Sequence, residues 1–258
     1  MKILVCIKAV PETEHAICAG EKTPEVNMED SVDVRMNRFD EFAVEEAVLI
    51  KESFPETMVD VITVGPENAQ KVIKRAIGMG ADNGTHILSD YHTSCDAVAV
   101  SSYIAQIAKK ESYDLILCGI MSEDMMQFAV GPMLAQRLSL PWATSVIYTS
   151  IQSDHQKIQV DRELEGGSKT IFEINLPALL TIQSGINEPR YPSLSNLLRA
   201  NTSRINVISA DALPAAPPSC RTVGYSYPEK KRDGLVLKGT PQEKAEALIQ
   251  ILREKSLL

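Results

Sequence analysis

The sequence predicts an α/β fold built on a doubly wound, mainly parallel sheet. Three observations favour this class: short apolar runs alternate with amphipathic helical stretches, the runs are apolar almost throughout, and most of them end near glycine or proline. Strands with two apolar faces are typical of parallel sheets that helices cover on both sides. We expect the strand order 3-2-1-4-5, which is common among doubly wound sheets.

The elements of the first half follow from these patterns. Strands are expected at residues 2–8, 58–64, 86–88 and 113–118, and helices at 40–54, 67–79, 95–110 and 127–138. The first helix has Phe42, Val44 and Val48 on its apolar face. Glu45 and Glu46 lie on the flank of this helix and are expected to be solvated.

The second half is expected to extend the sheet and then leave it. Two runs of alternating polarity flank Gly166 and Gly167, which predicts an antiparallel hairpin over 157–175, and 177–182 is expected to be a buried strand. We therefore predict one nucleotide-binding α/β domain over 1–209. Residues 210–258 are expected to form an extended arm that ends in a helix capped by Thr240 and Pro241 and packs on this chain or a partner subunit.

Composition excludes several classes of protein. The 258 residues include 26 Lys and Arg against 34 Asp and Glu, a net charge of −8 that argues against nucleic-acid binding. No apolar run approaches the roughly 18 to 20 residues of a membrane span, and the first residues do not resemble a signal peptide. The five cysteines form no CxxC pair, which predicts a reducing, cytoplasmic setting.

The predicted strand order points to a ligand site. In open parallel sheets, ligands bind beyond the carboxyl ends of the strands where the strand order reverses, here between strands 2–8 and 113–118. The lining would come from the loop after Lys8, the turn after Val64 and the segment 119–131.

The segment 119–131 has two interpretations at this stage. The helix expected from 127 would offer backbone N–H groups to a phosphate, with Asp124 and Gln127 as polar partners. Alternatively, Gly119 merely ends a strand and Gly131 merely shapes a helix start. The residues alone leave these readings equally open.

Other motifs are missing from the sequence. It contains no GxGxxG, no P-loop and no GxSxG, and His92 with Cys95 is too small a set for a metal site. A chain of this class without a catalytic set is typical of a carrier or a binding subunit, so we expect no catalytic and no metal residues.

Six segments form a recognisable series: 8–11 (KAVP), 36–47 (MNRFDEFAVEEA), 76–82 (AIGMGAD), 114–119 (DLILCG), 162–167 (RELEGG) and 187–194 (NEPRYPSL). In this order and spacing, the chain resembles the β subunit of electron-transfer flavoproteins over essentially its whole length. The resemblance implies an adenine-nucleotide α-hydrolase-like fold and a heterodimer with an α subunit that carries the redox FAD. It implies an electron carrier, not an enzyme, that serves an acyl-CoA dehydrogenase or a similar flavoprotein dehydrogenase.

The resemblance also implies binding residues. The nucleotide would contact Cys6, Asn37, Arg38, Phe39, Asp40, Val64, Gly119, Ile120, Met121, Ser122, Glu123, Asp124, Gln127, Phe128, Ala129, Val130 and Gly131. Glu163 falls where a carboxylate of the family approaches the flavin of the α subunit. The segment 187–198 resembles the recognition loop, with Tyr191, Leu194 and Asn196 as partner contacts. Leu194 would be the apolar anchor, and the competing interpretation makes it a core residue.

The resemblance leaves the β-subunit nucleotide open. Family members usually place Thr, Asn or Gln where phosphate is bound, whereas 125–131 (MMQFAVG) is more apolar. In the housekeeping type the nucleotide is AMP, and in the bifurcating type it is a second FAD that takes hydride from NADH. The run 130–135 and the terminal helix favour the second type.

Two rival classes fit less well. A stand-alone nucleotide sensor of the universal-stress type would lack the hairpin and the segment 187–194. An ATP-pyrophosphatase-like enzyme would carry a Ser-Gly-Gly loop after the first strand, where this chain has Lys8-Ala9-Val10-Pro11.

Overall fold

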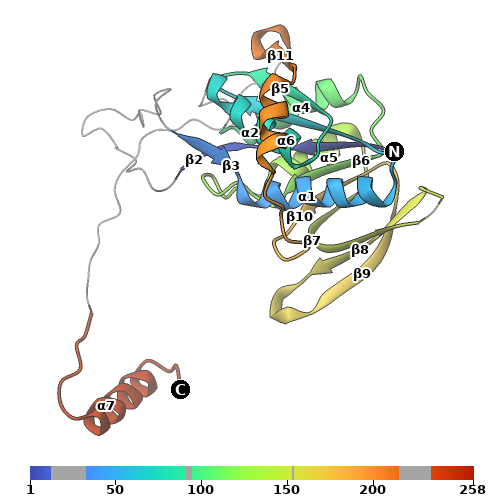
Figure 1. The fold of residues 1–258 in the computed structure, drawn as a ribbon. Helices are drawn as coiled ribbons and strands as arrows, with labels where there is room; N and C mark the ends of the chain where they lie inside the picture. The colour runs from blue at the N-terminus through green and yellow to red at the C-terminus, as the bar shows by residue number, and fades with distance from the viewer. Residues whose placement is uncertain (13–32, 91–94, 153, 215–233) are drawn as a thin grey trace. The chain divides into compact units, whose positions relative to one another are not determined.

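The structure is a computed structural model, and it describes residues 1–12, 33–90, 95–152, 154–214 and 234–258. The chain divides into two compact units, Met1–Gly224 and Tyr225–Leu258. The first unit contains a nine-stranded sheet with helices packed on it, and the second contains a C-terminal helix (Figure 1). His92, weighed above as a metal ligand, and much of the predicted arm lie outside the described residues.

The nine strands follow the order β11-β5-β4-β1-β6-β10-β7-β8-β9. The parallel centre consists of β5 (Asn83–Leu88), β4 (Met58–Gly65), β1 (Lys2–Cys6), β6 (Leu115–Gly119) and β10 (Ala178–Ile182). Among these five, the spatial order is third, second, first, fourth and fifth along the chain. The predicted doubly wound α/β fold is therefore confirmed, with the switch point between β1 and β6.

Helices cover both faces of the parallel centre (Figure 1). One face packs against α1 (Arg38–Ser53) and α2 (Gln70–Met79), the latter preceded by the 3-10 turn η1 (Glu67–Ala69). The other face packs against α4 (Ala97–Ala108) and α5 (Val130–Leu138). Alternation along the strands assigns side chains to the two cores, since every second residue of a strand faces the same side.

The sheet continues into an antiparallel extension. Strand β7 (Trp142–Ile151) pairs in parallel with β10 and antiparallel with β8 (Lys157–Glu163), which pairs with β9 (Lys169–Asn175). The connection between β8 and β9 is the 3-10 turn η2 (Glu165–Gly167), where Gly166 and Gly167 both have φ of 76°. This left-handed conformation suits glycine, and the predicted hairpin over 157–175 is confirmed.

Shorter elements complete the first unit. The strands β2 (Ala9–Pro11) and β3 (Val34–Met36) form a separate antiparallel pair. The helix α6 (Leu194–Thr202) leads into β11 (Ile205–Ser209), which pairs in parallel with β5, and the 3-10 turn η3 (Ala210–Ala212) follows.

The second unit contains α7 (Pro241–Glu254). Its start has the expected cap, because the Thr240 side chain accepts a hydrogen bond from the backbone N–H of Glu243 while the Glu243 side chain reaches back to Thr240. Leu248 and Ile249 of this helix are exposed. Within the described ranges, no helix has both the length and the apolar content that crossing a bilayer requires.

Two expectations about helices are corrected by the structure. Helix α5 begins at Val130 and not at Gln127, because Met126 and Phe128 have φ of 50° and 53°, in the left-handed region that an α-helix excludes. Glu45 and Glu46 are buried, at 4 % and 7 % exposure, and not solvated. Both bind groups of the segment that precedes α6, which lies too far along the chain for a helical pattern to reveal.

Candidate functional site

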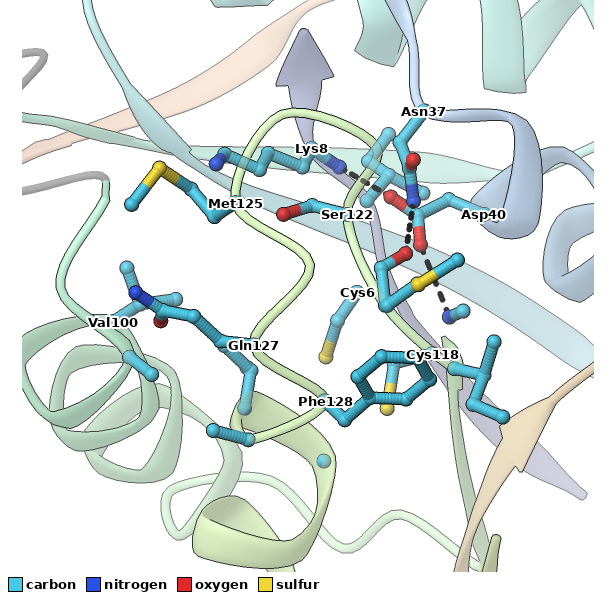
Figure 2. A pocket seen from close by; sticks show the side chains of 18 of the residues that line it. Cys6, Lys8, Asn37, Asp40, Val100, Cys118, Ser122, Met125, Gln127 and Phe128 are labelled. Atoms are coloured by element: carbon cyan, nitrogen blue, oxygen red, sulfur yellow. Dashed lines mark hydrogen bonds between the residues drawn. The ribbon is translucent and has the colours of Figure 1, made fainter. Parts of the chain in front are cut away.

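A cavity opens at the switch point, between the carboxyl ends of β1 and β6 and the helices α4 and α5 (Figure 2). The space between its lining atoms, including the open mouth, is about 690 Å³. Strands β1 and β6 are in register at Cys6 and Cys118, and both thiols line the cavity. Burial raises the pKa of each thiol, so both remain protonated at neutral pH.

Asp40 ties the ends of the two central strands together. Its Oδ2 accepts a hydrogen bond of 2.7 Å from the backbone N–H of Lys8, and its Oδ1 accepts one of 3.0 Å from that of Gly119. A Cβ on Gly119 would lie 2.4 Å from Asp40 Oδ1, so the absence of a side chain there permits this contact. Burial raises the pKa of Asp40 to about 7, although both backbone hydrogen bonds oppose the shift.

Asn37 holds the loop that follows β6. Its Nδ2 donates to the carbonyl oxygen of Met121 at 2.8 Å, and its Oδ1 accepts from the backbone N–H of Glu123 at 3.1 Å. The Glu123 carboxylate in turn accepts hydrogen bonds from Arg35 and from the backbone N–H of Arg38. The motif at 37–40 therefore has two roles: Asn37 and Asp40 line the cavity, and hydrogen bonds from the motif hold the loop after β6 that forms part of its wall.

An ion pair fixes the same loop from the side of β1. Lys8 Nζ lies 2.7 Å from Asp124 Oδ2, and the side chains are only 19 % and 11 % exposed. The Lys8 charge is therefore largely neutralised by Asp124, in a setting where little water screens the pair. Asp124, which the sequence analysis expected to be available to a ligand, is not among the residues that line the cavity.

Part of the cavity wall is apolar. It includes Val64, Val100, Ile104 and Met125, and Phe128 stands at the mouth with half of its surface exposed. A non-glycine residue in the left-handed region costs about 1 to 3 kcal/mol, and such strain concentrates at functional sites. The strained Phe128 lies two residues before α5, and Gln127 and the first residues of that helix line the cavity.

The structure brings most of the expected nucleotide residues together. Around the cavity lie Cys6, Asn37, Asp40, Val64, Gly119, Ile120, Met121, Ser122, Gln127, Phe128, Ala129, Val130 and Gly131. Arg38, Phe39, Glu123 and Asp124 do not line it. The sequence reasoning missed the contribution of Cys95, Ala97, Val100, Ile104 and Met125. The position of α4 beside the switch point would have identified its first turns as wall residues.

The residues expected to contact partners lie on another part of the first unit. Tyr191 and Leu194 are 87 % and 74 % exposed, so Leu194 is not a core residue. Asn196 is half-buried, and its backbone N–H donates a hydrogen bond of 3.3 Å to the hydroxyl of Ser193, which caps α6. Glu163 is exposed at the end of β8, where it accepts a hydrogen bond from Gln183 at 3.2 Å.

We also searched the described residues for side chains that could bind a metal ion. No group of three or more His, Cys, Asp or Glu side chains there is arranged to hold an ion. His86 is buried, and its Nε2 lies 2.9 Å from the carbonyl oxygen of Gly65, so it joins β5 to the end of β4.

Comparisons with known proteins agree with this geometry. A family model described as "Electron transfer flavoprotein domain" matches residues 26–213. The electron transfer flavoprotein subunit beta of Methylophilus methylotrophus is 34 % identical, covering 98 % of both chains, and that of Bacillus subtilis is 32 % identical, covering 99 % of both. A protein of Acetobacterium woodii named "Caffeyl-CoA reductase-Etf complex subunit CarD" is 32 % identical over the full length of both chains.

We predict that Asp40 makes stability depend on pH. Its folded-state pKa of about 7 exceeds the ordinary 3.8, so the native state binds the extra proton between these values. Stability is therefore greatest at the acid end and falls as the pH rises, by roughly 2 to 4 kcal/mol. In Asp40→Asn this fall should be missing, as measured by urea midpoints at pH 4.5 and pH 8. An identical fall in both proteins would contradict the assignment.

Proposed function

The chain belongs to the electron transfer flavoprotein family as a β subunit, and from this premise we propose that it binds an adenine nucleotide at the switch point and carries electrons together with an α subunit. The observation that supports this most is the cavity between β1 and β6. It lies where open parallel sheets bind nucleotides, and it gathers residues that the family resemblance assigns to the ligand.

The chemical character of the cavity fits an adenine nucleotide. The apolar wall of Val64, Val100 and Ile104 suits a planar ring, and the exposed ring of Phe128 can stack on one. The first N–H groups of α5, at Val130 and Gly131, and the amide of Gln127 suit a single phosphate. Nothing in this set activates a nucleophile or transfers a proton to substrate, so the proposed role is that of a carrier.

The redox chemistry belongs to FAD held mainly by the α subunit, which accepts and releases electrons one or two at a time. The proposed contribution of this chain is to cover that flavin with the surface around Glu163, at the end of β8. The exposed carboxylate of Glu163, steadied by Gln183, would lie beside the flavin and orient polar groups around it. The dehydrogenase would then dock on the surface that carries Tyr191 and Leu194, and electrons would pass between the two proteins while they are in contact.

A second candidate keeps the same fold and changes the nucleotide. In the bifurcating type, the β cavity holds a second FAD that oxidises NADH. The relative from Acetobacterium woodii, named as part of a reductase complex, and the apolar segment 125–131 favour this candidate. AMP and FAD share the adenosine phosphate portion, so the same cavity serves both proposals.

We also propose that the protein works in the cytoplasm. Cys6 and Cys118 are buried thiols without a disulfide although they are in register on neighbouring strands. A reducing compartment preserves such a pair.

The proposed function first predicts the cofactor content of the heterodimer. The heterodimer, purified after expression of this chain with an α subunit, is denatured and the released nucleotides are quantified. One FAD and one AMP per heterodimer are expected for the housekeeping type, and two FAD for the bifurcating type. One FAD with no second adenine nucleotide would defeat the proposal for the cavity. Expression of this chain alone as a yellow, monomeric product would argue against the proposed heterodimer with an α subunit.

The second prediction concerns Leu194 as the docking anchor for an acyl-CoA dehydrogenase or a similar flavoprotein dehydrogenase. Loss of a buried hot-spot side chain costs about 1 to 4 kcal/mol at an interface. Leu194→Ala should therefore raise the apparent KM of the dehydrogenase for the heterodimer by roughly 5-fold to several hundred-fold. Bound flavin, followed by its absorbance, should not change. Met58→Ala, at the amino end of the sheet with 46 % exposure, is the matched control. Unchanged transfer kinetics in Leu194→Ala would refute the docking role.

The third prediction concerns the terminal helix. Leu248 and Leu252 lie one turn apart on α7, and we propose that this face packs on the α subunit. Replacing both with Glu should weaken the heterodimer, because the charges would oppose burial of this face. Gln250→Glu, on the opposite side of the helix, should have no effect. Analytical ultracentrifugation at low protein concentration measures both, and unaltered association of the double variant would exclude this interface.

A further inference from the structure

The segment that carries the exposed docking residues is fastened to α1 by Arg190. The guanidinium forms a fork on Glu45: Nε lies 3.1 and 3.0 Å from the two carboxylate oxygens, and Nη2 lies 2.8 Å from Oε1. The Arg190 backbone N–H also donates to Glu45 Oε2 at 3.0 Å. A fork of this kind fixes orientation as well as distance, because the guanidinium and the carboxylate are both planar.

The two carboxylates that Arg190 binds differ in burial. The Glu45 side chain is 5 % exposed, whereas that of Glu52, which accepts a bond of 2.6 Å from Nη1, is 55 % exposed. The buried partner has no alternative donor in water, so it holds Arg190 firmly. The exposed partner is screened by solvent and contributes less.

Neighbouring contacts restrain the same segment at both of its ends. Upstream, Asn187 Nδ2 donates to the Phe42 carbonyl oxygen at 3.1 Å and to Glu46 Oε2 at 3.0 Å. Downstream, Pro192 lies against α2 at Gly78, where an added Cβ would be 3.2 Å from Pro192 Cβ. Arg190 is therefore the middle one of three residues that fasten the segment 187–192 to α1 and α2.

The docking residues follow Arg190 directly. The Arg75 guanidinium lies over the Tyr191 ring, with Cζ 5.1 Å from the centre of the ring. Tyr191 is nevertheless 87 % exposed. Ser193 caps α6, and Leu194 is the first residue of that helix. The direction in which Leu194 points is consequently set by the path of the chain from Arg190.

We propose that Arg190 is a positioning residue for docking: its fork on Glu45 holds Leu194 in the orientation that a dehydrogenase binds, without contact between Arg190 and that partner. The inference rests on the proposed docking role of Leu194. Holding an anchor in its bound orientation lowers the entropy lost on association, so the expected benefit is tighter docking at unchanged electron-transfer chemistry. Because the fork of Arg190 is directed toward α1 and not toward the docking partner, its effect on docking is expected to act through the position of Leu194.

The test uses the complete heterodimer, with the apparent KM and the kcat of a dehydrogenase measured at varied heterodimer concentration. Arg190→Gln should raise KM about tenfold with kcat and flavin absorbance unchanged. Arg190→Lys retains the charge but not the fork, and should recover less than half of the loss on a logarithmic scale. Arg199→Gln is the matched control, since Arg199 is an exposed cation of α6 that bonds only within its own helix in the described contacts.

A double-variant comparison separates positioning from general stability. In the Leu194→Ala background, Arg190→Gln should change KM by less than twofold, because the anchor to be positioned is already gone. If removing the buried partner of Glu45 prevents folding, Glu45→Gln with Arg190→Gln removes both charges and should show the same rise in KM. Circular dichroism and unfolding midpoints verify that each variant is folded.

The outcomes are distinct. If Leu194→Ala raises KM and folded Arg190→Gln does not, the positioning role is overturned while the docking role stands. Equal effects of Arg190→Gln with and without Leu194 would also overturn it, since the arginine would then act independently of the anchor. If Leu194→Ala has no effect, the docking role fails and this inference fails with it.

Discussion

Carboxylates buried along one helix impose the main constraint on this structure. Asp40, Glu45 and Glu46 of α1 are all buried, although they point to different sides of the helix, and a buried carboxylate is tolerated only where hydrogen-bond donors replace its lost water. Asp40 takes its donors from the ends of β1 and β6, and Glu46 takes them from Thr149 and Asn187. One helix thereby fixes the edge of the cavity and the segment before α6.

The cavity lies where the connections after two neighbouring strands go to opposite faces of the sheet. Helix α1, which follows β1 along the chain, packs on one face, and α5, which follows β6, packs on the other. The side chains of Asn37 and Lys8 hold this loop in place. The protein's own contacts therefore shape this part of the cavity wall, as is usual in small-molecule sites.

Sequence patterns predicted the centre of the fold well because burial there is periodic or continuous. The runs of β1, β4 and β6 are apolar on both faces, and the hairpin of β8 and β9 alternates around two glycines. The strand β11 was not predicted, since three of its five residues are exposed in a pattern without clear alternation. The start of α5 was misplaced because backbone strain at Phe128 leaves no mark in residue types.

The candidate site was predicted in position but not in its interactions. The switch-point rule located the cavity, and the family resemblance supplied most of its lining residues. Neither indicated that Lys8 would be bound by Asp124, or that Glu45 would pair with an arginine 145 residues away. Partners at such separations are brought together only by the folded chain, and a local pattern treats Glu45 and Glu46 as ordinary solvent-facing residues.

The proposed docking role of Leu194 would also have a kinetic consequence. Contacts of this size bury little area, so a complex that depends on them dissociates quickly, and differences among such complexes appear mainly in the rate of release. A carrier that docks through a single leucine would leave a spent donor soon after transfer and meet the next. Brief encounters of this kind favour throughput and allow one shuttle to serve several donors in turn.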